Sequence, residues 1–164
     1  DRALLTGNFE ACAVARCRQS GSSPWSFKVD CRDLPRNGTI AEACELAWGS
    51  APEADADKAD NTYQANRLTE DASVGVCAAT FAALAEGEIT EVTLHGTGVD
   101  YWVDRRRAVL EVSGIASGDP SRLAARHQSK TQQLKQGSLF QAGYGGYVFV
   151  VDFGEKETIL SYHS

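Results

Sequence analysis

The stretch Gly98–Ile115, GVDYWVDRRRAVLEVSGI, contains two apolar segments separated by a charged turn. The segments Val99–Val103 and Ala108–Ile115 are rich in aliphatic and aromatic residues, which favour β-strands. The four residues between them, Asp104 to Arg107, are polar and suit a tight turn. We therefore predict that the two segments form an antiparallel hairpin.

The flanking segments predict an alternation of helices and strands. A further strand is expected at Glu88–His95, joined to the hairpin through Gly96 and Gly98. Before it, apolar residues recur near helical spacing from Tyr63 to Glu86, and Gly87 suits a helix stop. The apolar residues that carry this helical pattern are Leu68, Ala72, Val76, Ala79 and Leu84.

After the hairpin, Asp119-Pro120 forms an N-cap followed by proline at the first helical position. A helix is expected from there to Gln136, with Gly137 ending it. Tyr147–Phe153 is almost wholly apolar, which is typical of a strand buried on both faces. A short last strand is expected at Thr158–Tyr162.

The first sixty residues give weaker patterns. Alternation of apolar and polar residues predicts strands at Asn8–Arg18 and Phe27–Cys31, paired as a hairpin. Thr39–Glu42 has the form of a capping box, which predicts a short helix ending near Trp48-Gly49. The polar acidic segment Ala51–Asp60 is expected to be a mobile loop.

Composition sets the broad class. A chain of 164 residues with 43% hydrophobic residues suits one domain with an ordinary core. It has no run of about 18 apolar residues, so no membrane span is expected. Asp1–Leu5 lacks the apolar region of a signal peptide, although the missing initiator Met leaves a removed upstream segment open. The five cysteines show no C-x-x-C pair, which favours small buried side chains in a reducing cytoplasm.

Charge is distributed unevenly along the chain. The net charge of −6 argues against a protein that coats nucleic acid generally. Residues 41–91 are strongly acidic, whereas residues 100–135 carry an excess of basic side chains. Such asymmetry can place a basic face on an acidic protein, and it is also common on ordinary solvated surfaces.

Two acidic residues of the predicted hairpin form the candidate site. Strand alternation puts Glu111 and Ser113 on one face, and Asp100 begins the neighbouring strand opposite Glu111. Two carboxylates at the end of a sheet supply the hard oxygen ligands that Mg²⁺ prefers. A metal held there would activate water and stabilise charge on a phosphodiester.

This hairpin, with GVDYWVD followed by AVLEVSG, resembles the PD-(D/E)XK nuclease superfamily, whose fold is called restriction-endonuclease-like. The resemblance covers residues 61–164 and includes the order helix, three strands, helix, strand. It implies that Asp100 and Glu111 bind Mg²⁺ or Mn²⁺, and that Glu70 in the long helix is a further ligand. Ser113 stands where the family's E-x-K motif has its lysine. The resemblance therefore leaves the positioning of the attacking water to Ser113 or to Lys130.

The helix that would line this site contains a polar run. Its members that resemble the family's site-lining helix are Gln128, Lys130, Gln132 and Gln133. The expected fold is thus α/β, with a mixed central sheet flanked by helices, in which a restriction-endonuclease-like core is preceded by a β-hairpin and a short helix. Residues 1–60 would form that N-terminal part, and residues 61–164 the core of the same single domain.

Each candidate residue also has an ordinary interpretation. Asp100 and Asp104 suit turns, Glu111 suits a solvent-facing strand position, and Glu70 suits a charged helix face. Lys130 with its neighbouring glutamines would then form a solvated stripe. Two further readings apply to other residues of the hairpin: Arg105–Arg107 either contact phosphates or solubilise the turn, and Trp102 is expected in the core.

Three functions remain open from the sequence. The first is a metal-dependent nuclease, or a nuclease-derived protein, that acts on DNA or RNA. The second is a non-catalytic interaction or scaffold subunit that binds a protein partner and keeps a degenerate nuclease-like fold. The third is an unrelated α+β protein whose hairpin matches the family by chance.

Overall fold

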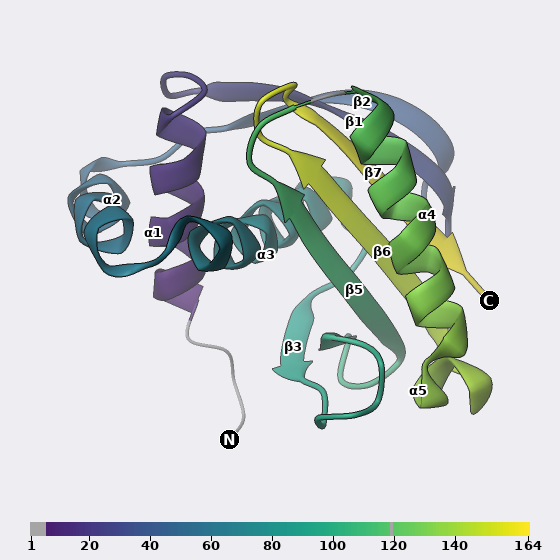
Figure 1. The fold of residues 1–164 in the computed structure, drawn as a ribbon. Coiled ribbons are helices and arrows are strands. Elements are labelled where there is room, and N and C mark those ends of the chain that lie inside the picture. The colour runs from purple at the N-terminus through teal and green to yellow at the C-terminus, as the bar shows by residue number, and fades with distance from the viewer. Residues whose placement is uncertain (1–5, 119) are drawn as a thin grey trace.

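A seven-stranded mixed sheet forms the centre of the molecule and carries helices on both faces (Figure 1). The computed structural model describes residues 6–118 and 120–164. The α/β class with a mixed central sheet, predicted from the sequence, is confirmed. The helices are α1 (Thr6–Arg18), α2 (Ser50–Thr62), α3 (Ala65–Leu84), α4 (Pro120–Gln136) and α5 (Ser138–Gln141). The strands are β1 (Trp25–Leu34), β2 (Gly38–Leu46), β3 (Ile89–Val92), β4 (Tyr101–Val103), β5 (Ala108–Ile115), β6 (Gly145–Asp152) and β7 (Glu157–His163).

The strands lie in the order β2-β1-β7-β6-β5-β4-β3. The pairs β5–β6 and β1–β7 are parallel, and the other neighbours are antiparallel. Strand β4 is short, and its pairing with β5 reaches only Tyr101 opposite Leu110. In the described chain, β5 therefore has no strand partner on this side from Glu111 onward. This open edge positions the candidate site.

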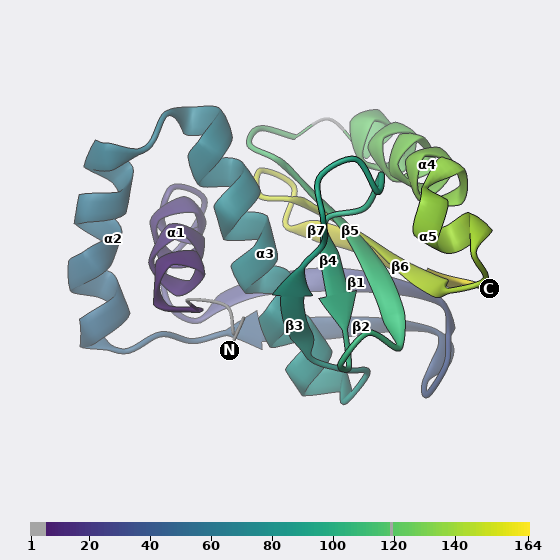
Figure 2. The same ribbon diagram turned by 90° about the horizontal axis from the view of Figure 1, so that it is seen from below.

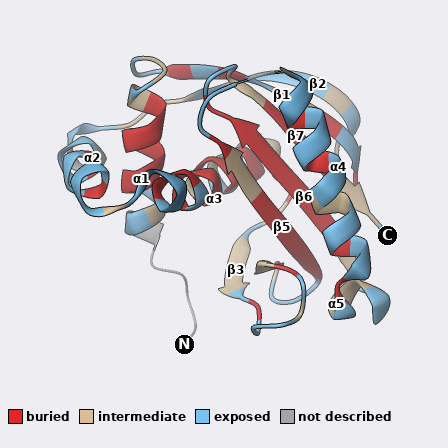
Figure 3. Cartoon of the chain, in the orientation of Figure 1, coloured by how far each residue is buried: buried red, intermediate tan, exposed pale blue. Residues whose placement is uncertain are grey.

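Helices cover the two faces unequally. Helices α1, α2 and α3 lie over one face, and α4 with α5 over the other (Figure 2). Each face has its own apolar cluster, and the large buried side chains Phe81 and Phe149 belong to the first. The smaller second cluster joins Leu123 and Leu134 of α4 to the sheet. Strand β6 is buried on both faces, as predicted, and appears red along its length in Figure 3.

The predicted elements from residue 61 onward are found close to their expected positions. The long helix is α3, which ends in the left-handed residue Ala85 (φ 52°), two residues before the predicted stop at Gly87. The expected hairpin is β4–β5, and the last helix is α4. Asp119, its predicted cap, and Asp1–Leu5 lie outside the described residues.

Composition led to two further expectations, one about the cysteines and one about membrane-spanning helices. The cysteines are free thiols, four of them buried and Cys44 half-buried, which agrees with their prediction as small core side chains. Among the helices of residues 6–118 and 120–164, none combines the length and apolar character needed to cross a bilayer.

The strand predicted at Asn8–Arg18 is wrong, because these residues form α1. Every residue from Ala11 to Cys17 is buried, since α1 packs between α2 and α3. A helix enclosed in this way shows no single apolar stripe. Its alternating alanines therefore gave the period-2 pattern that is typical of a strand. The predicted hairpin of this segment with Phe27–Cys31 is therefore also wrong.

The helix predicted from the capping box at Thr39–Glu42 is a strand. Residues 38–46 form β2, which pairs antiparallel with β1 along most of its length. The β1–β2 turn is fixed from outside, because buried Glu86 accepts hydrogen bonds from the backbone amides of Arg36 (3.2 Å) and Asn37 (3.0 Å). Tertiary pairing thus outweighs the local capping signal.

The mobile loop predicted at Ala51–Asp60 is helix α2. Ala56 and Ala59, three residues apart, are buried against α1. Asp57 pairs with Arg18 of α1 at 2.6 Å. Alanine favours helices strongly, and this acidic segment buries Ala56 and Ala59 while its carboxylates face solvent.

The crossing of α1 and α3 depends on Gly75. A Cβ at this position would lie 2.5 Å from the carbonyl oxygen of Phe9 and 2.9 Å from the Cβ of Ala13. Gly75→Ala is therefore expected to push the helices apart and to lower the free energy of unfolding by about 1–3 kcal/mol. Chemical denaturation measures the change. Gly7→Ala, also in α1 but with nothing within 4 Å, is the control and should leave stability unchanged or slightly higher. Equal effects of the two variants would contradict the close crossing.

Candidate functional site

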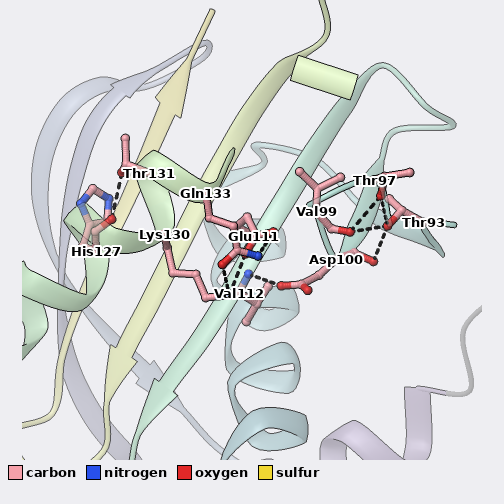
Figure 4. A network of polar contacts seen from close by, with 10 residues as sticks. All are labelled: Thr93, Thr97, Val99, Asp100, Glu111, Val112, His127, Lys130, Thr131 and Gln133. Atoms are coloured by element: carbon pink, nitrogen blue, oxygen red, sulfur yellow. Dashed lines mark hydrogen bonds and ion pairs between the residues drawn. The ribbon is translucent and has the colours of Figure 1, made fainter. Parts of the chain in front are cut away.

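Glu111 is the most unusual residue of the sheet, since it is a fully buried carboxylate (0% exposed) in an otherwise apolar strand. Its side chain lies on the α4 side of β5. Lys130 Nζ donates to Glu111 Oε2 at 2.8 Å, and Gln133 Nε2 donates to Oε1 at 3.0 Å (Figure 4). Lys130 also donates to the Gln133 side chain at 3.1 Å. The solvent-facing interpretation of Glu111 is therefore wrong.

Asp100 approaches the same place from the head of β4. Its backbone amide donates to Leu110 O (3.1 Å), and its carbonyl accepts from Thr93 N (3.0 Å). Its Oδ2 accepts a hydrogen bond from the amide of Val112 at 3.0 Å. The carboxylate thus occupies the position along β5 that a neighbouring strand would otherwise take, beside Glu111.

The loop before Asp100 is braced by threonine hydroxyls. Thr93 Oγ1 donates to the carbonyl of Val99, and Thr97 Oγ1 donates to Thr93 Oγ1 at 3.1 Å (Figure 4). Buried Val99 packs with the cluster beneath α4. These contacts hold the backbone at Asp100 without using its side chain, which leaves that carboxylate available at the edge.

Helix α4 presents Lys130 and Gln133 because its other side is anchored. Leu123 and Leu134 pack into the apolar cluster, and His127 Nε2 lies 2.8 Å from Ser161 Oγ of β7. Burial lowers the pKa of His127 to about 4, so this imidazole is neutral at physiological pH. The anchored helix fixes the direction of Lys130, whose side chain is 18% exposed.

The electrostatics of the site favour a proton on Glu111. Burial first, and then the negative charge of Asp100, raise the pKa of Glu111 from 4.5 to about 7. The ammonium of Lys130 acts in the opposite direction, and a side-chain hydrogen bond with Asp100 adds to the increase. Two close carboxylates beside a single ammonium leave unpaired negative charge, which a cation would neutralise.

The donor set fits a cation that requires few protein ligands. Within the described ranges, no group of three or more His, Cys, Asp and Glu side chains is arranged to hold a metal. Asp100 and Glu111 supply two carboxylates. In a strand the N–H and C=O of one residue point the same way, so the Val112 carbonyl faces the open edge as well. Mg²⁺ is commonly held by one or two carboxylates, with water and substrate oxygens completing its shell.

Ser113 and Glu70 lie in an adjacent polar cavity of about 340 Å³. Ser113 is half-buried, two residues beyond Glu111 on the same strand. Glu70 is exposed on α3, and its carboxylate makes no ion pair among the described residues. The structure therefore brings Asp100, Glu111 and Lys130 together, and places Ser113 with Glu70 next to them.

The remaining candidates have ordinary roles. Asp104 is a turn residue (φ 48°) whose Oδ1 accepts the Glu88 amide at 2.9 Å. Trp102 is buried, as predicted, and the guanidinium of Arg106 lies 5.9 Å from its ring centre. Arg106 also pairs with Glu91 at 2.8 Å. Gln128 and Gln132 are exposed on α4.

Sequence reasoning did not place Arg122 and Arg126 at the site, although both line the polar cavity. The spacing of the basic residues along α4 indicates that they lie on the same side of the helix as Lys130. Arg122, Arg126 and Lys130 are each four residues apart, and Gln133 follows three later. Side chains at such spacing share one helix face. That face runs beside the open edge of β5.

Comparison with models of protein families, with curated protein sequences and with solved structures gave no significant match to this chain.

The raised pKa of Glu111 predicts a pH-dependent stability. A carboxyl with a higher pKa in the folded state than in the unfolded state stabilises the fold at low pH, and this contribution is lost as pH rises through the folded pKa. The stability gain of Glu111→Gln over wild type should therefore grow from pH 5 to pH 8, and above pH 7 it should reach about 3 kcal/mol for a rise of the pKa from 4.5 to about 7. Urea unfolding across this pH range measures the difference.

Glu53→Gln is the control for this experiment, because Glu53 is exposed on α2. Its stability should follow the wild-type curve at every pH. A constant difference between Glu111→Gln and wild type would show that Glu111 does not titrate in this range.

Proposed function

We propose that this protein is a metal-dependent nuclease of the PD-(D/E)XK type, which hydrolyses phosphodiesters of DNA or RNA. One observation carries the proposal: Asp100, Glu111 and Lys130 converge at the open edge of β5, with Lys130 Nζ 2.8 Å from Glu111 Oε2. Two carboxylates and an ammonium group at a free strand edge form an arrangement suited to a phosphodiester substrate.

Asp100 and Glu111 would hold Mg²⁺ or Mn²⁺ through carboxylate oxygens, with the Val112 carbonyl as a further donor. Such an ion supplies an activated water and neutralises charge on the phosphate. The fixed backbone at Asp100 orients its carboxylate before any ligand arrives. Burial of Glu111 strengthens its attraction for a cation, because water screens the charge less there.

Lys130 would take the role of the lysine of the E-x-K motif, at whose position this chain has Ser113. Its ammonium reaches Glu111 from α4 instead of from β5. In that place it would orient the attacking water and stabilise the charge that develops on the phosphate oxygens. Ser113, in the neighbouring cavity, offers a hydroxyl without positive charge.

The arrangement of elements supports the same class. From Ala65 onward the chain runs α3-β3-β4-β5-α4 and enters β6 after the short helix α5. Apart from α5, this is the order of helix, three strands, helix and strand on which the sequence resemblance rests. The free, mostly buried cysteines support a reducing compartment such as the cytoplasm.

A scaffold subunit with a degenerate site is the second candidate. The ion pair between Lys130 and Glu111 favours it, since this pair already satisfies the buried carboxylate in the absence of a metal. In that case α4 would be held to β5 by the pair, and the surface would serve a protein partner. Metal binding distinguishes the two candidates.

Calorimetric titration with Mn²⁺ tests the metal site. Wild type should bind one ion, and both Asp100→Asn and Glu111→Gln should weaken binding at least about tenfold, since each removes a charged ligand. The affinity should fall about tenfold per pH unit below pH 7, because Glu111 must release its proton. Glu53→Gln, on α2, should bind like wild type. Equal affinities for all four proteins would rule out this site.

Lys130→Met tests the catalytic cation. Cleavage of labelled DNA and RNA oligonucleotides with Mn²⁺ should fall about 10²–10³-fold, as for loss of a charge-stabilising donor. Mn²⁺ affinity should be retained or increased, because the ion pair no longer competes for Glu111. The matched control is Lys135→Met on an exposed part of α4. Absence of metal-dependent cleavage by wild type on every substrate would favour the scaffold function.

A further inference from the structure

The polar cavity beside the carboxylate pair has the character of an anion-binding site. It lies at the far end of β5, between α3 and α4, and has a volume of about 340 Å³. Its polar lining includes Asn66, Thr69, Glu70, Ser113, Arg122 and Arg126. The two guanidinium groups outweigh the single carboxylate, so the lining carries a net positive charge on an acidic protein.

Within the part of the chain that the structure describes, the arginines of this cavity have no carboxylate partner. In residues 6–118 and 120–164, neither Arg122 nor Arg126 forms an ion pair. By contrast, Arg67 and Arg106 pair with carboxylates at 3.0 Å and 2.8 Å. An unpaired guanidinium presents a planar set of donors that matches phosphate oxygens in bidentate fashion.

The spacing along α4 relates this cavity to the proposed centre of cleavage. Lys130 contacts Glu111, and Arg126 and Arg122 follow on the same helix face at intervals of four residues. Each interval advances about 6 Å along a helix, at about 1.5 Å per residue. That step is comparable to the separation of adjacent phosphates along a nucleic-acid strand. The cations of α4 therefore follow the open edge of β5 at intervals suited to a strand backbone.

We infer that the Arg122–Arg126 cavity binds a backbone phosphate of the nucleic-acid strand, next to the phosphate that Asp100, Glu111 and Lys130 would act on. Both guanidinium groups donate to its oxygens, and the Ser113 hydroxyl donates from β5. This inference rests on the proposed function for the identity of the ligand. Ser113 would then position the substrate. Its position in the E-x-K motif had instead suggested a role in positioning the attacking water.

Glu70 lowers the affinity of the cavity for a phosphate, because its carboxylate lines the same space. This residue therefore offers a second test that acts in the opposite direction. Removing its charge should tighten binding of the strand in the absence of metal, because the carboxylate repels a phosphate in the cavity.

The experiment measures binding of a fluorescein-labelled 12-nucleotide single strand, as DNA and as RNA, by anisotropy in EDTA over a range of salt concentrations. Arg122→Gln/Arg126→Gln should weaken binding at least about tenfold and reduce the salt slope by about 0.7, since the variant loses one phosphate contact and each such contact on a single strand contributes about 0.7. Glu70→Gln should tighten binding severalfold. The control, Arg105→Gln/Arg107→Gln, removes the same charge from the exposed β4–β5 turn and should keep the wild-type slope within about 0.3.

Equal losses in the two double variants would overturn the inference, since they would indicate only long-range attraction by net charge. Wild-type affinity in Arg122→Gln/Arg126→Gln, or no binding by wild type, would overturn it as well. Cleavage assays with Mn²⁺ separate this outcome from the proposed function. Cleavage by the Arg122/Arg126 variant with an unchanged KM would refute the phosphate site alone. Arginine-dependent binding without cleavage by wild type would refute the nuclease and retain the phosphate site.

Discussion

The buried carboxylate of Glu111 is the constraint on which the site depends. A charged group without water is strongly unfavourable unless other groups compensate it. Here the compensation comes from α4, where Lys130 and Gln133 donate hydrogen bonds to the carboxylate, whereas the negative charge of Asp100 disfavours its ionised form. The position of α4, the early end of β4 and the braced loop at Thr93 all serve to bring these groups to one place. A protein selected for stability alone would have an aliphatic residue at this position of β5.

The same constraint connects stability with function. Burial first, and then the neighbouring charge of Asp100, raise the pKa of Glu111 to about 7, so a bound cation would stabilise the ionised form of the two carboxyl groups. Strongly perturbed carboxyl groups of this kind concentrate at functional sites, although structural ion pairs also produce them. What favours function here is the open strand edge, because a purely structural pair would not need the end of β4 to stop short of Glu111.

The sequence predicts the part of the fold whose segments carry strong local signals. Strand β5 and helix α4 combine apolar runs or caps with clear boundaries, and both were found where expected. The first sixty residues mislead because tertiary packing decides them. Helix α1 is buried on several sides and loses its periodicity, and β2 acquires its strand form only by pairing with β1.

Asp100 and Glu111 were predictable as neighbours from strand alternation, whereas the reach of Lys130 to Glu111 depends on how α4 is anchored through Leu134 and His127. The place of Arg122 and Arg126 depends on the same anchoring.

A crystal structure grown with Mn²⁺, using anomalous diffraction at the manganese edge, tests the central claim most directly. We expect one anomalous peak at about 2.0–2.3 Å from oxygens of both Asp100 and Glu111, with Lys130 Nζ no longer hydrogen-bonded to the metal-bound oxygen of Glu111. A map with no peak between the two carboxylates at saturating Mn²⁺, and with the Lys130–Glu111 contact of 2.8 Å retained, would contradict it. The pair would then be a structural clamp between α4 and β5.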